Sequence, residues 1–477
     1  MKILFVTPEV APLARTNNLA DFSYYLPQHL INQGVDVRIV TPLYKSSNLK
    51  KTQTVDDFGI NMFNRVETCI LKKVNINKMV VYLIQNYQYF ERDFMYAYDD
   101  DCERFAFFSK AVIHMLKHID FKPDVIHLND WNSAGVSIIL NEKSNLDKFY
   151  KNIAITYTIH NLGYQGICSR GFLKVLGVGD SVFDIKKAEY YNMINHMKIG
   201  IIYSDVVTTV SKSYAKEIQT RDFGNGLDGI LRSREKDLFG IINGIDYKKF
   251  NPKIDDVLKK NYDSGNLESK AFNKTFLQDK LNLPRKDVPI IVFAAPLTDE
   301  KGVELLLESI DDICENDVQL VIIGIGNAVY EYSLKFAMSK YKYQIFTLIG
   351  EDEELLRQVF AAGDIFLAPY RWEPSGVNEL IAIRYGLIVV ARNIGLLKDC
   401  VIDQEKRNGY GYMFDKFSKD SMLEELKKAI ECYGDKKQWN TMVKRALKAN
   451  FSWSNTAKEY KNIYSIAIKN REKSFDE

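Results

Sequence analysis

The chain has 477 residues, of which 46% are hydrophobic and 26% charged, so it is long enough for two globular domains with separate cores. Its 64 lysines and arginines nearly balance its 62 aspartates and glutamates, which gives no support for a nucleic-acid or membrane surface. No apolar run approaches the roughly 18 residues of a membrane span, and MKILFVTPEV reads as a first strand rather than a signal peptide. We therefore expect a cytoplasmic protein with neither nucleic-acid nor membrane partners.

In the first half of the chain, short β-branched runs alternate with helical patterns. The runs are continuously apolar, which is typical of parallel strands buried on both faces. Helices are predicted between them, for example over 103–118 and 133–141. The strands predicted in this half are 2–7, 35–41, 78–85, 124–130, 153–161 and 205–211.

The same alternation restarts in the second half, so the fold class predicted is α/β, with two Rossmann-like, doubly wound parallel sheets facing a central cleft. A cluster of Gly, Asn and Pro at 243–253 marks the expected boundary between domains 1–248 and 249–455. The charged stretch 254–287 is expected to be helical, and 456–477 is expected to form a helix that packs back on the first domain. The strands predicted here are 288–297, 318–326, 343–350, 364–370 and 387–393.

The cysteines are scattered, form no CxxC pair, and have no histidine at ligand spacing. Reduced thiols and the absence of a zinc site are therefore expected. The six are Cys69, Cys102, Cys168, Cys314, Cys400 and Cys432.

Ligands of doubly wound sheets bind beyond the carboxyl ends of the strands, and unusual residues follow several predicted strands. Residues 364–386 are the most informative case, because an apolar strand ends at a Pro and Glu373 follows in a tight Pro-Ser-Gly turn before a helical pattern. Helix N-termini at such edges attract anions. An acid beside an anion site suggests group transfer from a phosphorylated donor, whereas the plainer alternative is a capped surface loop.

Several longer motifs resemble those of the bacterial glycogen synthase and plant starch synthase family, in the same order and over about residues 1–465. The resemblance implies a retaining glucosyltransferase of the GT-B architecture that needs no metal or other cofactor. Its partners would be the nucleotide sugar ADP-glucose and the non-reducing end of an α-1,4-glucan. The motifs include HLNDW (127–131), TIHNLGYQG (158–166), FGNGLDGILRSR (223–234), INGIDYKKFNP (242–252) and EPSGVNELIAIRYG (373–386).

The resemblance also implies roles for single residues. Asp130 and His160 would line the donor glucose, Lys301 would hold the leaving diphosphate, and Glu373 would stabilise positive charge on the sugar. A fixed cation and a fixed carboxylate would stabilise both charges that develop as the glycosidic bond breaks. The donor and nucleotide set would be Arg15, Asn17, Asn18, Lys198, Gly324, Gly326, Ser375, Gly376 and Gly395.

Each of these residues also has a plainer interpretation. Asp130 and Glu373 could cap helices, His160 could be a satisfied core histidine, and Lys301 could be solvated in its turn.

The chain departs from the family pattern where that pattern contacts the nucleotide or diphosphate. Arg15-Thr16-Asn17-Asn18 replaces Lys-Thr-Gly-Gly, Pro296 replaces an arginine, Ile394 a threonine, and Glu351 a common tyrosine. Three functions stay open: an active glycogen synthase-like enzyme, an impaired paralogue that binds glucan or a true synthase, or a transferase for another nucleotide or a lipid phosphate. The donor nucleotide, acceptor length and oligomeric state are left open as well.

Overall fold

The computed structural model describes residues 1–47, 49 and 51–474. The chain folds into two compact units. Unit 1 comprises Met1–Ile241 together with the C-terminal segment from Trp453, and unit 2 comprises Ile242–Ser452. The boundary expected after residue 248 lies just inside unit 2.

Unit 1 is built on a nine-stranded sheet of order β12-β11-β7-β6-β1-β2-β5-β4-β3. From β12 to β5 every neighbouring pair is parallel, as the continuous apolar runs predicted. These strands are β1 (Lys2–Val6), β2 (Asp36–Pro42), β5 (Met79–Gln85), β6 (Val125–Asn129), β7 (Ala154–Ile159), β11 (Val206–Thr209) and β12 (Leu238–Gly240).

A hairpin that the sequence analysis did not predict extends this sheet. Its strands, β3 (Gln53–Asn61) and β4 (Val66–Ile76), pair antiparallel with each other, and β4 pairs antiparallel with β5. Most of β3 is exposed or half-buried, so it lacks the apolar run that marks a buried strand. A small antiparallel sheet is formed by β8 (Ile167–Cys168), β10 (Met193–Asn195) and β9 (Glu189–Tyr190).

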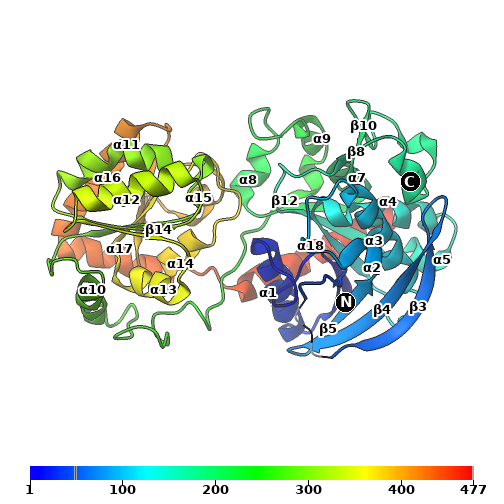
Figure 1. Ribbon diagram of the computed structural model, residues 1–477, viewed down its shortest axis with the longest axis horizontal. Helices are drawn as coiled ribbons and strands as arrows, with labels where there is room; N and C mark the ends of the chain where they lie inside the picture. Colours follow the sequence, from blue (N-terminus) through cyan, green and yellow to red (C-terminus); the bar gives the residue numbers. More distant parts are fainter. Residues whose placement is uncertain (48, 50, 475–477) are drawn as a thin grey trace. The chain divides into compact units, whose positions relative to one another are not determined.

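The helices of unit 1 include the C-terminal helix α18 (Trp453–Lys473), which lies beside α1 (Asn18–Asn32) and also packs against β7 (Figure 1). Inside this contact the buried Tyr464 hydroxyl lies 2.7 Å from Nδ1 of His127 in β6. The other helices are α2 (Tyr87–Phe90), α3 (Asp101–Met115), α4 (Asp130–Ser144), α5 (Lys148–Lys151), α6 (Phe172–Leu176), α7 (His196–Tyr203), α8 (Lys212–Glu217) and α9 (Asp228–Ser233), with short 3-10 turns at Asp180–Val182 and Glu235–Asp237.

Unit 2 has an all-parallel sheet of order β15-β14-β13-β16-β17-β18, the strand order of a Rossmann fold. The last strand, β18, was not predicted from the sequence. The strands are β13 (Ile290–Ala294), β14 (Gln319–Gly324), β15 (Ile345–Ile349), β16 (Ile365–Ala368), β17 (Ile388–Arg392) and β18 (Gly411–Phe414).

Helices cover both faces of the unit 2 sheet, with α11, α12 and α16 on one side and α10, α13, α14 and α17 on the other (Figure 1). A short 3-10 turn, η3 (Asp299–Lys301), precedes α11. The helices are α10 (Glu268–Lys280), α11 (Val303–Cys314), α12 (Ala328–Lys340), α13 (Glu353–Ala362), α14 (Asn378–Arg384), α15 (Gly395–Cys400), α16 (Lys419–Gly434) and α17 (Lys436–Lys448).

The expectation that 254–287 is helical is wrong for most of this stretch, in which only α10 is an α-helix. Side chains before α10 bond to the backbone instead: Asn261 Nδ2 donates to the carbonyls of Pro252 and Asp255. Asparagine and aspartate that satisfy the backbone locally compete with helix formation. Among the helices of the described residues, none is both long and apolar enough to cross a membrane.

The contact between α18 and β6 can be tested with Tyr464→Phe. The change leaves Nδ1 of the fully buried His127 without its partner, because the other ring nitrogen is already 2.7 Å from the Thr158 hydroxyl. We expect the free energy of unfolding of unit 1 to fall by about 1–3 kcal/mol, measured by thermal and chemical denaturation. Tyr332→Phe, at a side chain that is 74% exposed, is the matched control and should change nothing; equal stability of both variants would contradict the prediction.

Candidate active site

In unit 1, polar loops follow β1, β6 and β7, which are neighbours in the sheet. Because the three strands are parallel, their carboxyl ends share one edge. The loop after β1 carries Arg15, Asn17 and Asn18, Asp130 begins α4 directly after β6, and His160 follows β7.

Asp130 is held in a left-handed backbone conformation with φ of 53°, which few residues other than glycine, asparagine and aspartate adopt readily. Its Oδ1 accepts a 2.8 Å hydrogen bond from the backbone N–H of His160. The carboxylate therefore fixes the loop after β7 and is not simply a cap of its own helix. Burial raises the pKa of Asp130 to about 7, although the backbone N–H groups that it accepts from lower it.

The ring of His160 is oriented by its surroundings. Its Nε2 lies 3.0 Å from Oδ1 of Asn129, whose amide nitrogen donates to the carbonyl of Val6. With the amide nitrogen occupied in this way, Asn129 offers only an acceptor to His160, which favours the tautomer protonated at Nε2 and leaves Nδ1 as an acceptor. The edge of the ring packs on Phe22 of α1 at 4.5 Å, and burial lowers the pKa of His160 to about 3, so the ring is neutral at pH 7.

Glu9 has no role in the sequence prediction, yet it organises the loop after β1. The side chain is fully buried and accepts from the Thr16 backbone N–H at 2.6 Å, the Asn17 side-chain amide at 3.0 Å and the Tyr96 hydroxyl at 3.0 Å. Burial raises the pKa of Glu9, and hydrogen bonds from Thr16 and Tyr96 partly offset this effect. The one signal in the sequence is an acid placed shortly after a buried strand.

Asn17, which stands where the family pattern has a glycine, is used for local structure. Asn17 is in an extended conformation, with φ of −152°, and its side-chain oxygen accepts from the Leu19 N–H at 2.8 Å as the N-cap of α1. Arg15 pairs with Asp21 at 2.7 Å, and Asn18 is the exposed first residue of α1. The Asn17 side chain is therefore turned back onto Glu9 and the helix end.

Lys198 lies in α7, after the small sheet. Its side chain is buried, and Nζ donates to the carbonyls of Ile185 and Glu189 at 2.5 Å each. Asn195 caps the same helix by accepting from the Lys198 N–H at 2.9 Å. In this structure Lys198 thus ties segment 185–189 to α7.

In unit 2 the predicted residues follow β13, β14, β16 and β17, four neighbouring parallel strands. Lys301 in η3 forms an ion pair with Glu373, and its ammonium lies 4.6 Å from the centre of the Tyr370 ring. The two side chains are 18% and 3% exposed, so Lys301 is not a solvated turn residue. Burial by itself lowers the pKa of Lys301, but the adjacent carboxylates more than offset this effect and raise it above its ordinary value.

A second carboxylate, Glu379 in α14, belongs to the same cluster and was not predicted. A Cβ on Gly376 would lie 2.0 Å from Oε2 of Glu379 and 3.1 Å from Cδ of Glu373, so a larger residue here would have to displace the Glu379 carboxylate. Burial, and then the charge of Glu373, raise the pKa of Glu379 to about 7. One lysine and two carboxylates therefore share a buried cluster, in which Glu373 pairs with Lys301 and the raised pKa of Glu379 lets this second acid hold a proton.

The remaining predicted residues lie around this cluster or on the same edge. The Ser375 N–H donates to Oε1 of Glu373 at 3.1 Å, and Gly395 has a positive φ of 44° at the start of α15. Gly324 and Gly326 pack on the backbone that follows β13, where added Cβ atoms would lie 2.2 and 2.4 Å from carbonyl oxygens. Exposed Pro296 lies in that same backbone segment.

Comparison with known proteins gives consistent matches over both units. Residues 2–233 match the family model of the starch synthase catalytic domain, and residues 274–447 match that of glycosyl transferases group 1. The glycogen synthase of Moorella thermoacetica is 39% identical over 477 residues, covering 99% of this chain and 98% of the relative. The glycogen synthase of Clostridium novyi is 41% identical over 476 residues, covering 98% and 99%.

Among solved structures, the catalytic domain of starch synthase IV from Arabidopsis thaliana, bound to ADP and acarbose, matches with a TM-score of 0.86 and 28% identity. The match covers 98% of this chain and 99% of that chain. The two Rossmann-like units together with this match make the fold GT-B. The chain belongs to the glycogen synthase and starch synthase family of glycosyltransferases.

Proposed function

We propose that this protein transfers glucose from ADP-glucose to the non-reducing end of an α-1,4-glucan with retention of configuration. The observation that carries the proposal is the buried contact between Lys301 and Glu373 at the carboxyl edge of the unit 2 sheet. Its relatives named glycogen synthase span nearly the whole chain, and the Arabidopsis starch synthase structure holds ADP and acarbose.

The charges of the unit 2 cluster suit the transfer. As the bond between glucose and phosphate breaks, negative charge grows on the diphosphate and positive charge on the sugar ring. The Lys301 ammonium would stabilise the first charge, and the carboxylate of Glu373 the second. Because the cluster is almost free of solvent, both interactions are stronger than they would be in water.

In unit 1, Asp130 and His160 would contact the donor glucose. The bonds from Asp130 to the loop after β7 and from Asn129 to the His160 ring hold both residues before substrate arrives. Groups fixed in advance lose little free energy to reorganisation during the reaction. We assign the reaction to the cytoplasm, and nucleotide sugar and glucan are the only partners that the proposal requires.

Lys301→Ala tests the proposed chemistry. Incorporation of labelled glucose from ADP-glucose into glycogen should fall by at least about 10²–10³-fold, because the diphosphate loses its fixed cation. UDP-glucose assayed in parallel identifies the preferred nucleotide. Removing Lys301 also leaves Glu373 as a buried unpaired charge, which can destabilise the fold. The melting temperature of the double variant Lys301→Met with Glu373→Gln should therefore be measured as well, to separate loss of activity from loss of folding.

Lys286→Ala is the matched control, because this lysine of the same unit is exposed and pairs with exposed Asp317. Full activity in that variant and loss in Lys301→Ala would support the proposal. Binding of glycogen by the natural chain without any incorporation from either donor would instead favour a regulatory paralogue.

A second test restores the family residues in Pro296→Arg, Asn17→Gly and Asn18→Gly together. If the natural chain is an active enzyme, we expect the restored variant to change the KM for ADP-glucose while both proteins show incorporation. The Asn17 cap of α1 is lost in this variant, at a cost of only a few tenths of a kcal/mol with glycine. Activity confined to the restored protein would mean that the natural chain has lost its chemistry.

Glu379→Gln tests the electrostatics of the cluster through stability. The folded pKa of Glu379 lies above its ordinary value of 4.5, so the unfolded chain releases this proton first, and stability falls as pH rises from 4.5 to about 7. Glutamine removes that loss. Between pH 5 and pH 8, the free energy of unfolding of the variant should rise relative to that of the wild type, by up to about 3 kcal/mol. Melting experiments across this pH range measure the difference. Glu308→Gln, at an exposed acid, is the control and should show the same pH dependence of stability as the wild type. An effect of Glu379→Gln that does not change with pH would refute the raised pKa of Glu379.

A further inference from the structure

Three side chains without a predicted role lie together in unit 1: Cys102 of α3, Cys168 of β8 and His196 of α7. Their sulfur and nitrogen atoms all lie within 4.8 Å of one another. Within the described part of the chain, no other three His, Cys, Asp or Glu side chains form such a candidate metal-binding group. The three residues come from separate segments, so their spacing along the sequence matches no metal-binding motif, and the sequence predicted none.

The separation between two of these ligand atoms is that of a tetrahedral zinc site. Sγ of Cys168 lies 3.6 Å from Nε2 of His196. With Zn–S of about 2.3 Å and Zn–N of about 2.0–2.1 Å, two tetrahedral ligands are about 3.6 Å apart. The pair therefore has the required spacing without a change of conformation.

The orientation of His196 is fixed by the fold. Antiparallel pairing places Cys168 opposite Ile194, and the backbone N–H of His196 donates to the Gly166 carbonyl at 3.1 Å. The imidazole packs on Phe172, with 4.6 Å between the ring centres.

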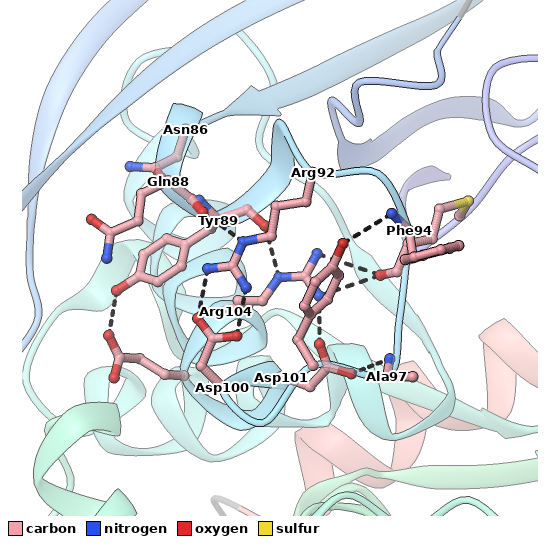
Figure 2. A network of polar contacts seen from close by, with 12 residues as sticks. Asn86, Gln88, Tyr89, Arg92, Phe94, Ala97, Asp100, Asp101 and Arg104 are labelled. Atoms are coloured by element: carbon pink, nitrogen blue, oxygen red, sulfur yellow. Dashed lines mark hydrogen bonds and ion pairs between the residues drawn. The ribbon is translucent and has the colours of Figure 1, made fainter.

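The backbone at the start of α3, which carries Cys102, is held by a polar network around Asp100, Asp101 and Arg104 (Figure 2). Arg92 forms two 2.6 Å bonds with Asp100, and the fully buried Arg104 contacts Asp101 and donates to the Tyr89 carbonyl at 2.7 Å. The two residues before Cys102 and the second residue after it are thus anchored, which fixes the backbone that carries the thiol. Cys102 and Cys168 are both half-buried, so a metal ion can reach them.

We propose that Cys102 Sγ, Cys168 Sγ and His196 Nε2 bind one Zn²⁺, with water in the fourth position. Both cysteines bind as thiolates, so two thiol protons are released to solvent on binding. The metal joins α3 to β8 and α7, and therefore holds the segment between β8 and α7 in place. It takes no part in the glucosyl transfer, and the inference does not depend on the proposed function.

The test uses the full chain, reduced and stripped of metal with a chelator, and titrated with Zn²⁺ by calorimetry and with Co²⁺ by absorbance. We expect one metal per chain, a thiolate-to-Co²⁺ charge-transfer band in the near ultraviolet, proton release, and a higher melting temperature with Zn²⁺. None of these readouts requires enzymatic activity.

Cys102→Ser and His196→Gln should each weaken Zn²⁺ binding by at least about 100-fold, since loss of even an outer-shell partner costs 10–100-fold. Cys314→Ser, a half-buried cysteine of unit 2, is the matched control and should bind like the wild type. If a variant misfolds, the Co²⁺ spectrum of the wild type still tests the proposal, because it reports directly on thiolate ligands. Absence of the charge-transfer band, binding unchanged in Cys102→Ser, or a Cys102–Cys168 disulfide in the protein as isolated would each overturn the proposal.

Discussion

Parallel pairing of the strands is the constraint on which the rest of this structure depends. Neighbouring parallel strands end at the same edge of a sheet, so loops far apart in sequence are brought side by side. In unit 1 this applies to the loops after β1, β6 and β7, and in unit 2 to those after β14, β13, β16 and β17. A candidate residue on one of these loops lies at the carboxyl edge of the sheet because it directly follows a strand.

The second determinant is the burial of charge. Lys301 and Glu373 stabilise each other in a place where either one alone would be costly, and Glu379 adds a further carboxylate to the same cluster. The pairing keeps the lysine charged and in place. In unit 1 the carboxylates serve a different purpose. Asp130 accepts from a backbone N–H of the neighbouring loop after β7, and Glu9 accepts from a backbone N–H within its own loop, so both hold loops in shape.

At Asn17, the departure from the family pattern disturbs the structure less than the sequence alone suggests. Asn17 stands at a family glycine position, but its side chain caps α1 and bonds to Glu9. Its backbone is extended, so this position does not need the left-handed conformation that favours glycine. Pro296 remains the substitution with the clearest chemical consequence, since it cannot supply the charge that the family arginine carries. Its segment keeps the close backbone packing with Gly324 and Gly326.

The sequence by itself determined the fold class, the two-unit plan and the family, because continuous apolar runs and long motifs are local signals that packing rarely overrides. The β3–β4 hairpin and β18 escaped it, because most of β3 is exposed or half-buried and so lacks a continuous apolar run, and because β18 is a short run at the edge of its sheet. Only the tertiary structure decided that Glu9 and Glu379 join the candidate sites and that Cys102, Cys168 and His196 meet. The two cysteines and the histidine are brought together by long-range packing, which no spacing along the chain encodes. Glu9 and Glu379 lie near their partners in sequence, and only the fold shows that both acids are buried.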